Sequence, residues 1–299
     1  MKEAALHELL ADPDYQILKR VPTTLTHKTS TDPKSFVATI IDLETMGLDP
    51  NKHEIIEIGL LSFSFSSADG ILDIVTTYNE LNDPCKPIPE EVTKVTGIRD
   101  EDVKGKAIDW EHVSQSLKAS HLVICHNSAF DRNFLEMQTP EPIQVIVQSL
   151  PFACTVRDID WKKYGIESSK LDYINWKLGY FYDGHRAIND CWATLNILLQ
   201  AESVFDELKS NVRKREVIIC AKDAPFDKKD LLKARNYRWS DGTARLPKGW
   251  WICIDSAFLD EEKQWLDEEI YERQGASNKI PKGDITARNR YSFRAEMLS

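Results

Sequence analysis

The chain has 299 residues, of which 42% are hydrophobic and 29% are charged, and its formal net charge is −10 at pH 7. These values are typical of a globular protein with room for one large domain and a smaller one. No apolar run approaches the length of a membrane helix, and the N-terminal MKEAALHELL lacks the apolar core of a signal peptide. The six cysteines include no C-x-x-C pair, which argues against a zinc site or a disulfide framework. We therefore expect a cytoplasmic protein with no membrane partner.

Charge divides the sequence into two parts. Residues 1–210 hold 20 Lys and Arg against 33 Asp and Glu, whereas residues 211–299 hold 18 against 15. This difference indicates two units with different roles. Residues 22–35 are rich in Thr, Ser, Pro and Lys and read as a linker. We therefore expect an N-terminal helical segment and linker over 1–35, a main domain over 36–208 and a small α+β accessory domain over 211–299.

The first half of the main domain predicts three strands. The stretch 36–48 reads FVATIIDLETMGL, and its apolar start is typical of a strand buried on both faces. Residues 54–66 and 71–78 follow as further strands with short connections, which predicts an antiparallel meander.

Strands and helices alternate in the second half of the main domain. Pro89 and Gly97 mark the start and end of one helix. Further helical segments are expected at 110–119, from about Ser128, at 156–164, at 169–178 and at 187–208, with strands at 122–125 and 143–150. A meander followed by such alternation predicts an α/β domain with a mixed sheet flanked by helices.

The first strand runs directly into two acids, Asp42 and Glu44. Residues two apart on a strand point the same way, so both carboxylates project from one face. Two like charges at this distance raise each other's pKa, and hard divalent cations neutralise such a pair. Taken alone, such a pair is more often a strand end with two solvated acids.

Three more candidates lie downstream. Asp131 falls in the first turn of the helix from Ser128, where it could also be a favourable charge at a helix N-terminus. In HRAINDCW, His185 stands five residues before Asp190. On one continuous helix these two side chains would diverge by roughly 140°. They can converge only if His185 lies on the loop that Asp183-Gly184 begins.

In this order and spacing, Asp-x-Glu, HNxxFD and His-x4-Asp resemble the DEDD superfamily of 3′–5′ exonucleases. The His-x4-Asp element is similar to the histidine-containing (DEDDh) branch, typified by the DnaQ-like epsilon proofreading subunit of bacterial DNA polymerase III. The resemblance covers about residues 36–205, with IIEIG (55–59) and GHRAIND (184–190) as further echoes. It implies a ribonuclease H-like fold.

The resemblance also implies catalytic roles. Asp42, Glu44, Asp131 and Asp190 would hold two divalent cations, Mg²⁺ or Mn²⁺, with Asp42 touching both. Such a pair stabilises the attacking and leaving oxygens of a displacement at phosphorus. His185 would take a proton from the attacking water, because an unperturbed imidazole titrates near neutral pH.

The residues expected around the nucleotide depart from the family at two places. Thr45-Met46-Gly47 stands where Thr-Thr-Gly is common, and Thr96 stands where the family commonly has His. We expect Met46 to be able to wedge under a terminal base, because a flexible thioether fills irregular gaps. The expected substrate-binding set is Thr45, Met46, Gly47, Leu48, Thr96, Asn127 and Phe130.

Residues 211–299 predict a compact βαββαβ module, with the last strand around Tyr291–Phe293. Its string KARNYRW (233–239) interleaves basic and aromatic residues, a pattern typical of single-strand binding. We expect Trp239, Trp251 and Trp265 to fill the small core and Trp250 to face solvent. The expected strand contacts are Arg235, Arg238, Lys248 and Trp250, all on one face.

The sequence thus predicts a metal-dependent 3′–5′ exonuclease that releases nucleoside monophosphates from a single-stranded 3′ end, with DNA favoured. One alternative is an RNA-trimming exoribonuclease of the same branch. Another is a non-catalytic nucleic-acid or polymerase adaptor with this fold. The expected partners are a DNA or RNA 3′ end and a polymerase or other protein that binds residues 211–299.

Overall fold

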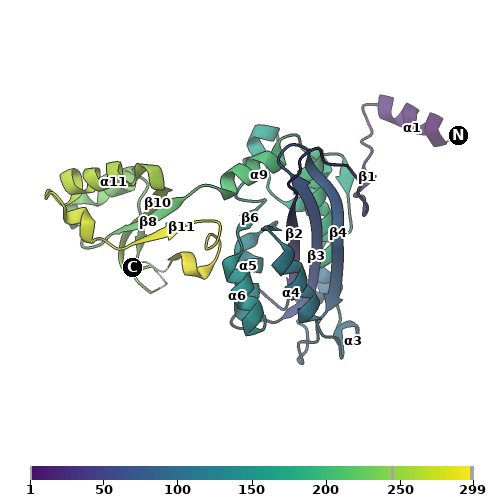
Figure 1. Cartoon of the computed structure of the whole chain (residues 1–299), viewed down its shortest axis with the longest axis horizontal. Coiled ribbons are helices and arrows are strands. Elements are labelled where there is room, and N and C mark those ends of the chain that lie inside the picture. Colours follow the sequence, from purple (N-terminus) through teal and green to yellow (C-terminus); the bar gives the residue numbers. More distant parts are fainter. Residues whose placement is uncertain (1, 244–245, 297–299) are drawn as a thin grey trace. The chain divides into compact units, whose positions relative to one another are not determined.

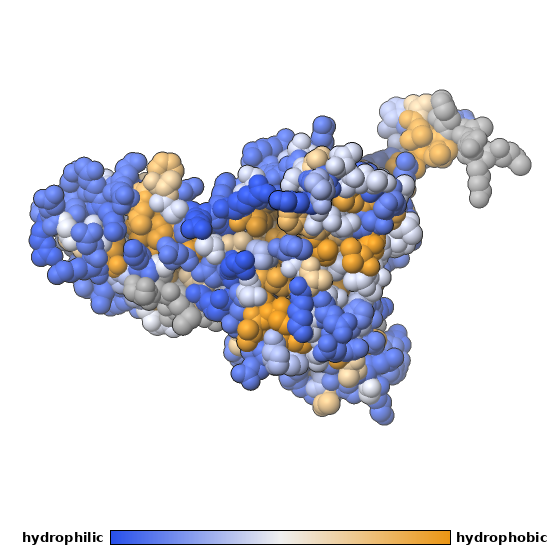
Figure 2. Space-filling view, in the orientation of Figure 1, coloured by the Kyte–Doolittle hydropathy of each residue, from blue (hydrophilic) through white to orange (hydrophobic). Residues whose placement is uncertain are grey.

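The computed structural model describes residues 2–243 and 246–296 (Figure 1). Contacts divide the chain into two compact units: residues up to 147 with 153–209 form the first, and residues 148–152 with those from 210 onward form the second. Hydrophilic residues cover most of the visible surface of each unit, and smaller apolar areas are scattered among them within each unit (Figure 2). Among the described helices, none is both long and apolar enough to cross a membrane.

The first unit is built on a five-stranded mixed sheet in the order β4-β3-β2-β5-β6. The expected meander consists of β2 (Phe36–Thr45), β3 (Ile55–Ser66) and β4 (Gly70–Leu81), drawn in dark blue in Figure 1. β2 also pairs in parallel with β5 (Leu122–Cys125), and β6 (Phe152–Cys154) lies beyond β5. The predicted α/β class with a mixed sheet is confirmed.

Helices flank this sheet. β3 is buried along nearly its whole length, so both of its faces are covered. α8 (Ala187–Gln200) packs on β2, β3 and β4, whereas α4 (Trp110–Ala119) and α5 (Ser128–Gln138) pack on β2 or β5. The smaller elements are α1 (Lys2–Ala11), β1 (Lys19–Arg20), α2 (Glu90–Thr96), α3 (Asp100–Val103), the 3-10 turn Trp161–Tyr164, α7 (Leu171–Lys177), β7 (Tyr180–Phe181) and α9 (Val204–Val212).

The prediction of a strand at 143–150 is wrong. This stretch lies in helix α6 (Glu141–Ser149). Ile143 and Val147, four residues apart, are buried, while Val145 between them is 63% exposed. This is the period of a helix packed on one face. The strand comes just afterwards, as β6.

Two predicted helices are shorter than expected. Of residues 156–164, only the 3-10 turn Trp161–Tyr164 is helical. The long helix expected at 187–208 is interrupted between α8 and α9, where Ser203 has a φ of +65°. A left-handed residue cannot continue a right-handed helix, so the apolar periodicity runs on through a break in the backbone.

The second unit has the predicted βαββαβ order. It comprises β8 (Glu216–Ala221), α10 (Lys229–Ala234), β9 (Arg238–Ser240), β10 (Gly249–Asp255), α11 (Leu259–Trp265) and β11 (Lys282–Ile285). The sheet order is β11-β8-β10-β9, with every neighbouring pair antiparallel. The π-helical segment Leu266–Ile270 continues α11, and short 3-10 turns at Phe226–Lys228, Ser256–Phe258, Ala276–Lys279 and Phe293–Glu296 complete the unit.

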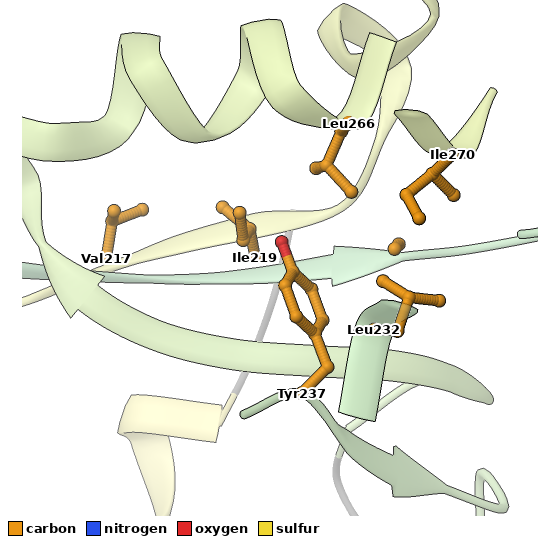
Figure 3. Close-up of a cluster of buried hydrophobic side chains, with 7 residues drawn as sticks. Val217, Ile219, Leu232, Tyr237, Leu266 and Ile270 are labelled. Atoms are coloured by element: carbon orange, nitrogen blue, oxygen red, sulfur yellow. The ribbon is translucent and has the colours of Figure 1, made fainter. Parts of the chain in front are cut away.

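A small apolar core joins the two helices of this unit to its sheet. Val217 and Ile219 of β8 meet Leu232 of α10 and Leu266 and Ile270 of the other helical segment (Figure 3). Tyr237, between α10 and β9, closes one side of this cluster.

The last strand was predicted at the wrong place. It is β11, several residues earlier in the chain, and not Tyr291–Phe293. Tyr291 has a φ of +70°, which is incompatible with a strand, and Phe293 begins a 3-10 turn.

Candidate active site

Three carboxylates meet where β2 ends. Asp42 and Glu44 lie on β2 opposite Gly59 and Glu57 of β3, and the β2–β3 register shifts just after Glu44. One oxygen each from Asp42, Glu44 and Asp190 lies within 4.8 Å of the other two. Residues 42 and 190 are far apart in the sequence, so α8 must cross the sheet at this point to complete the group.

Asp131 lies beside this group without being one of the three. It sits in the first turn of α5, is only 3% exposed, and its Oδ1 accepts the Leu43 N–H at 3.1 Å. Its negative charge raises the pKa of both Asp42 and Glu44. The four predicted carboxylates therefore form one electrostatic unit.

Burial and mutual repulsion make this unit unfavourable when fully ionised. Burial, followed by the charges of the other acids, raises the pKa of Asp42 well above its usual value and that of Glu44 to about 8. Burial also raises the pKa of Asp131 to about 7 and raises the pKa of Asp190. Closely spaced carboxylate oxygens are the ligands that hard divalent cations prefer. The donor set therefore fits such ions, because they would relieve the repulsion.

Two groups near the start of α8 orient Asp190. The Tyr182 hydroxyl donates to Oδ1 at 3.1 Å, and the Arg186 backbone N–H donates to Oδ2 at 3.1 Å. The charge on Asp190 in turn contributes to raising the Tyr182 pKa, after burial. Sequence reasoning did not find Tyr182, because a tyrosine before a loop carries no distinctive signal.

His185 is on the loop that leads into α8. Its φ is +60°, its side chain is exposed, and Asn189 Nδ2 ties the loop by donating to the Asp183 carbonyl at 2.8 Å. The charge of His185 is among the influences that lower the Asp190 pKa, against the larger effect of burial. The histidine therefore precedes the helix, as the five-residue spacing required.

An ion pair between the buried Glu57 and the partly exposed Arg186 holds the start of α8 against β3. Glu57 is fully buried and accepts two-pronged hydrogen bonds from Arg186, at 2.8 Å from Nη2 and 3.1 Å from Nε. It also accepts the Ala187 backbone N–H at 3.1 Å and Asn79 Nδ2 at 3.0 Å. Sequence reasoning assigned no role to Glu57, although an acid inside the apolar run IIEIG was a usable signal.

Gly59 allows this close approach. A Cβ at residue 59 would lie 2.5 Å from the carbonyl carbon of Ala187 and 2.6 Å from the backbone nitrogen of Ile188. These are backbone atoms and cannot move aside as a side chain would. A glycine is therefore required where α8 crosses β3.

The loop after Glu44 presents one apolar side chain to solvent. Leu48 is 84% exposed, whereas Met46 is buried in a cluster with Ile56, Ile98 and two other buried apolar residues. The Met46 side chain thus faces a core, which leaves Leu48 as the side chain in this loop that is free to meet a base. Thr45 donates its hydroxyl to the Gly47 carbonyl at 2.6 Å.

The other expected substrate contacts differ in exposure. Thr96 is buried, and its hydroxyl donates to the Val92 carbonyl. Asn127 is exposed at the start of α5, and its side chain does not cap the helix. Phe130 is half-buried against Phe134, with ring centroids 4.9 Å apart.

The expected strand contacts of the second unit do not share a face, contrary to the prediction. Trp250 pairs across strands with Trp239, whereas Arg238 pairs with Trp251, so Trp250 and Arg238 point to opposite sides of the sheet. Arg235 Nε is committed to a buried carboxylate, Glu262, at 2.9 and 3.0 Å. Lys248 is exposed.

Two tryptophans exchange their expected positions. Trp239, expected in the core, is 52% exposed, whereas Trp250, expected in solvent, packs against the core of Figure 3. Trp265 and Trp251 pack against apolar clusters as predicted.

Comparison with known proteins places this arrangement in a family. The family model described as Exonuclease (RNase_T) matches residues 39–198, which is more than half of the chain. The chain belongs to this exonuclease family. The predicted resemblance to the DEDD superfamily is confirmed, and the matched range of this exonuclease contains all four carboxylates and His185.

Among curated relatives, the exonuclease is similar to DNA polymerase III PolC-type of Thermotoga petrophila, with 27% identity over 216 residues, covering 67% of this chain and 14% of the relative. The PolC-type protein of Clostridium perfringens is 27% identical over 162 residues, covering 53% and 11%. The chain thus spans about a seventh or less of the length of these relatives.

Two solved structures were also matched. One is exonuclease X in complex with 5′ overhanging duplex DNA, with 24% identity, a TM-score of 0.40 and coverage of 58% of this chain and 92% of that chain. The other is a 3′-exonuclease with 3′-end specific recognition of a histone mRNA stem-loop, with 19% identity, a TM-score of 0.44 and coverage of 61% and 68%.

The contact at Gly59 makes a prediction about ion binding. Gly59→Ala should push the first turn of α8 off β3 and displace Asp190, weakening Mg²⁺ binding by about tenfold or more, as loss of a supporting residue does at other metal sites. Mg²⁺ affinity can be measured by isothermal titration calorimetry. Thr77→Ala, at an exposed site on β4, is the matched control and should bind Mg²⁺ normally. Wild-type affinity in Gly59→Ala would contradict this positioning.

The raised pKa values make a prediction about pH. The folded chain binds protons at Glu44 (pKa about 8) and Asp131 (pKa about 7) more tightly than the unfolded chain does. Without metal, these groups therefore stabilise the fold at low pH, and their contribution is lost as the pH rises toward about 8. Divalent ions need deprotonated ligands and cancel the repulsion. Mg²⁺ should therefore raise Tm more at about pH 8 than at about pH 6.

Thermal unfolding in Mg²⁺ and in EDTA at the two pH values measures this difference. Glu44→Gln, which removes one titrating group, should reduce it. An equal Mg²⁺ effect at both pH values would be inconsistent with the cluster as the binding site.

Proposed function

We propose that the chain is a metal-dependent 3′–5′ exonuclease that hydrolyses the terminal phosphodiester bond of a single strand and releases nucleoside monophosphates. The observation that carries this proposal is the convergence of the half-buried Asp42, Glu44 and Asp190 within 4.8 Å, beside the buried Asp131. When its acids are ionised, such a cluster is repulsive unless cations occupy it. The PolC-type relatives are DNA polymerases, which favours DNA as the substrate and a polymerase as a partner.

Four carboxylates suit two ions, and Mg²⁺ or Mn²⁺ fits their oxygen donors. Asp42, Glu44, Asp131 and Asp190 would hold them. When bound, such ions stabilise the attacking and leaving oxygens of a displacement at phosphorus. The chain's own contribution is orientation: Tyr182 and the Arg186 amide each fix one oxygen of Asp190.

His185 is proposed as the general base. In the described part of the chain, no hydrogen bond or ion pair engages its ring, and the ring is exposed, so a ring nitrogen is free to take a proton from an attacking water. The positive φ at His185 turns the backbone of the loop just before α8. The next residue, Arg186, is held by its ion pair with Glu57, which fixes the end of the loop.

Side chains around the carboxylates are proposed to hold the 3′ nucleotide. Leu48 offers an exposed apolar surface for the terminal base, and Phe130 a half-buried ring. Asn127, exposed at the start of α5, can hydrogen-bond to the sugar or phosphate. These contacts accept any unpaired terminal nucleotide.

Labelled oligomers test the proposal. DNA and RNA strands labelled at the 5′ or 3′ end, single- or double-stranded, should be shortened stepwise from the 3′ end in Mg²⁺ or Mn²⁺, with single-stranded DNA degraded fastest. Preferred cleavage of RNA would identify an RNA-trimming enzyme. Binding without any cleavage would indicate an adaptor. Shortening from the 5′ end, or activity that survives EDTA, would refute the metal-dependent 3′–5′ reaction.

The role of His185 makes a separate prediction. His185→Asn keeps a residue that tolerates positive φ but removes the base, so kcat should fall by roughly 10²–10⁴. The Mg²⁺-dependent rise in Tm should persist in this variant. Asp190→Asn, in contrast, should reduce that rise itself. A His185→Asn enzyme within a few-fold of wild type would show that the proton goes elsewhere.

A further inference from the structure

The second unit carries a continuous row of rings and lysines along α10 and the neighbouring strands. Lys229 Nζ lies 4.3 Å from the centroid of the Phe226 ring. Lys233, one helical turn later, has its Nζ 5.9 Å from the Trp250 ring. Trp250 meets Trp239 edge to face, with ring centroids 5.4 Å apart. These five residues are called the aromatic–lysine row.

Both ends of the row are open to solvent. Phe226 is 79% exposed and Trp239 is 52% exposed, although both are large apolar rings. Trp239 lies on β9, which is the edge strand of its sheet. Trp250 is packed beneath against the core, so it supports the exposed Trp239 ring from one side. The row thus offers rigid rings with accessible faces.

The charge of the row is not neutralised. Across the described residues, neither Lys229 nor Lys233 forms an ion pair with a carboxylate. Residues 226–251 hold seven Lys and Arg against three Asp, whereas residues 255–272 hold one Lys against eight Asp and Glu. The three acids of residues 226–251 are Asp227, Asp230 and Asp241. Positive charge is therefore concentrated in the segment that carries the exposed rings.

We propose that the aromatic–lysine row is a binding surface for a single strand of nucleic acid. Bases stack on exposed rings irrespective of sequence, and ammonium groups between the rings contact the phosphates. A duplex suits the row poorly because its bases are already stacked on one another. The inference rests on the proposed function in that it takes the ligand to be a nucleic-acid strand.

Equilibrium binding to the full chain tests the proposal. Fluorescence anisotropy with oligothymidylate of about 16 nucleotides, a length that suits small single-strand-binding folds, can be measured in EDTA so that no strand is cut. Trp239→Ala should raise Kd by about fivefold or more. Trp239→Phe, which keeps a ring, should restore most of the affinity. Lys233→Gln should reduce the slope of log Kd against log salt by about 0.7, the loss of one phosphate contact.

Arg238→Gln is the matched control. It removes one positive charge next to Trp239 in the sequence but on the opposite side of the sheet, over the Trp251 ring. It should leave both Kd and the salt slope nearly unchanged. The inference is overturned if Trp239→Ala binds as wild type does, if Arg238→Gln weakens binding as much as Lys233→Gln, or if duplex DNA competes as well as the single strand.

Activity on a minimal substrate separates this inference from the proposed function. The p-nitrophenyl ester of thymidine monophosphate has one base and does not need the row, so Trp239→Ala should hydrolyse it at the wild-type rate. If wild type hydrolyses neither the ester nor oligomers, the proposed function fails, while the effect of Trp239→Ala on Kd still decides the inference. A rate on the ester that falls with Trp239→Ala would show that this variant perturbs the fold, and would overturn the reading of its Kd.

Discussion

The active site depends on how closely α8 approaches β3. At Gly59 the backbone of Ala187 and Ile188 occupies the space that any other side chain would need. This contact places the first turn of α8 over the strand next to β2, so Asp190 reaches the carboxylates at the end of β2. A larger separation would remove Asp190 from the cluster and leave only Asp131 beside Asp42 and Glu44.

The crossing of α8 over β3 also brings negatively charged side chains close together, so they repel one another. Glu57, buried beneath the start of α8, is neutralised by Arg186, yet its charge still adds to the raised pKa of Asp42 and Glu44. The Glu57–Arg186 ion pair thus holds α8 in place but does not remove the negative charge around Asp42 and Glu44. Because closely packed carboxylates resist ionisation, the fold holds ready a set of ligands whose repulsion divalent ions relieve. Rigidity and affinity for metal therefore come from one arrangement of residues.

The sequence predicted a helix or strand best where its hydrophobic periodicity and the residues at its ends indicated the same type of element. The run 36–45 begins as an apolar strand and ends in acids, and it was found as β2; the helix expected at 110–119 is α4, which Asp109 caps. IQVIVQSL fits a buried strand or a one-sided helix equally well, and only tertiary packing of Ile143 and Val147 decides. The positions of Trp239 and Trp250 were exchanged because strand alternation separates Trp250 from Trp251 but does not say which side α10 covers. Gly59 and Glu57 acquire meaning only when a segment about 130 residues away is placed over them.

The two units treat charge in opposite ways, and the difference bears on how a polyanion could be used. The first unit carries an excess of 13 acids over residues 1–210 and gathers its functional ones into one partly buried cluster, which divalent cations can compensate. Long-range attraction of a nucleic-acid strand cannot originate there, because net negative charge repels phosphate. The second unit instead leaves Lys229 and Lys233 unpaired at the surface, next to rings that gain little from burial in its small core. Unpaired lysines and exposed rings contribute little to the stability of the second unit. A bound ligand with both phosphates and bases would give them partners: phosphates for the lysines and bases for the rings.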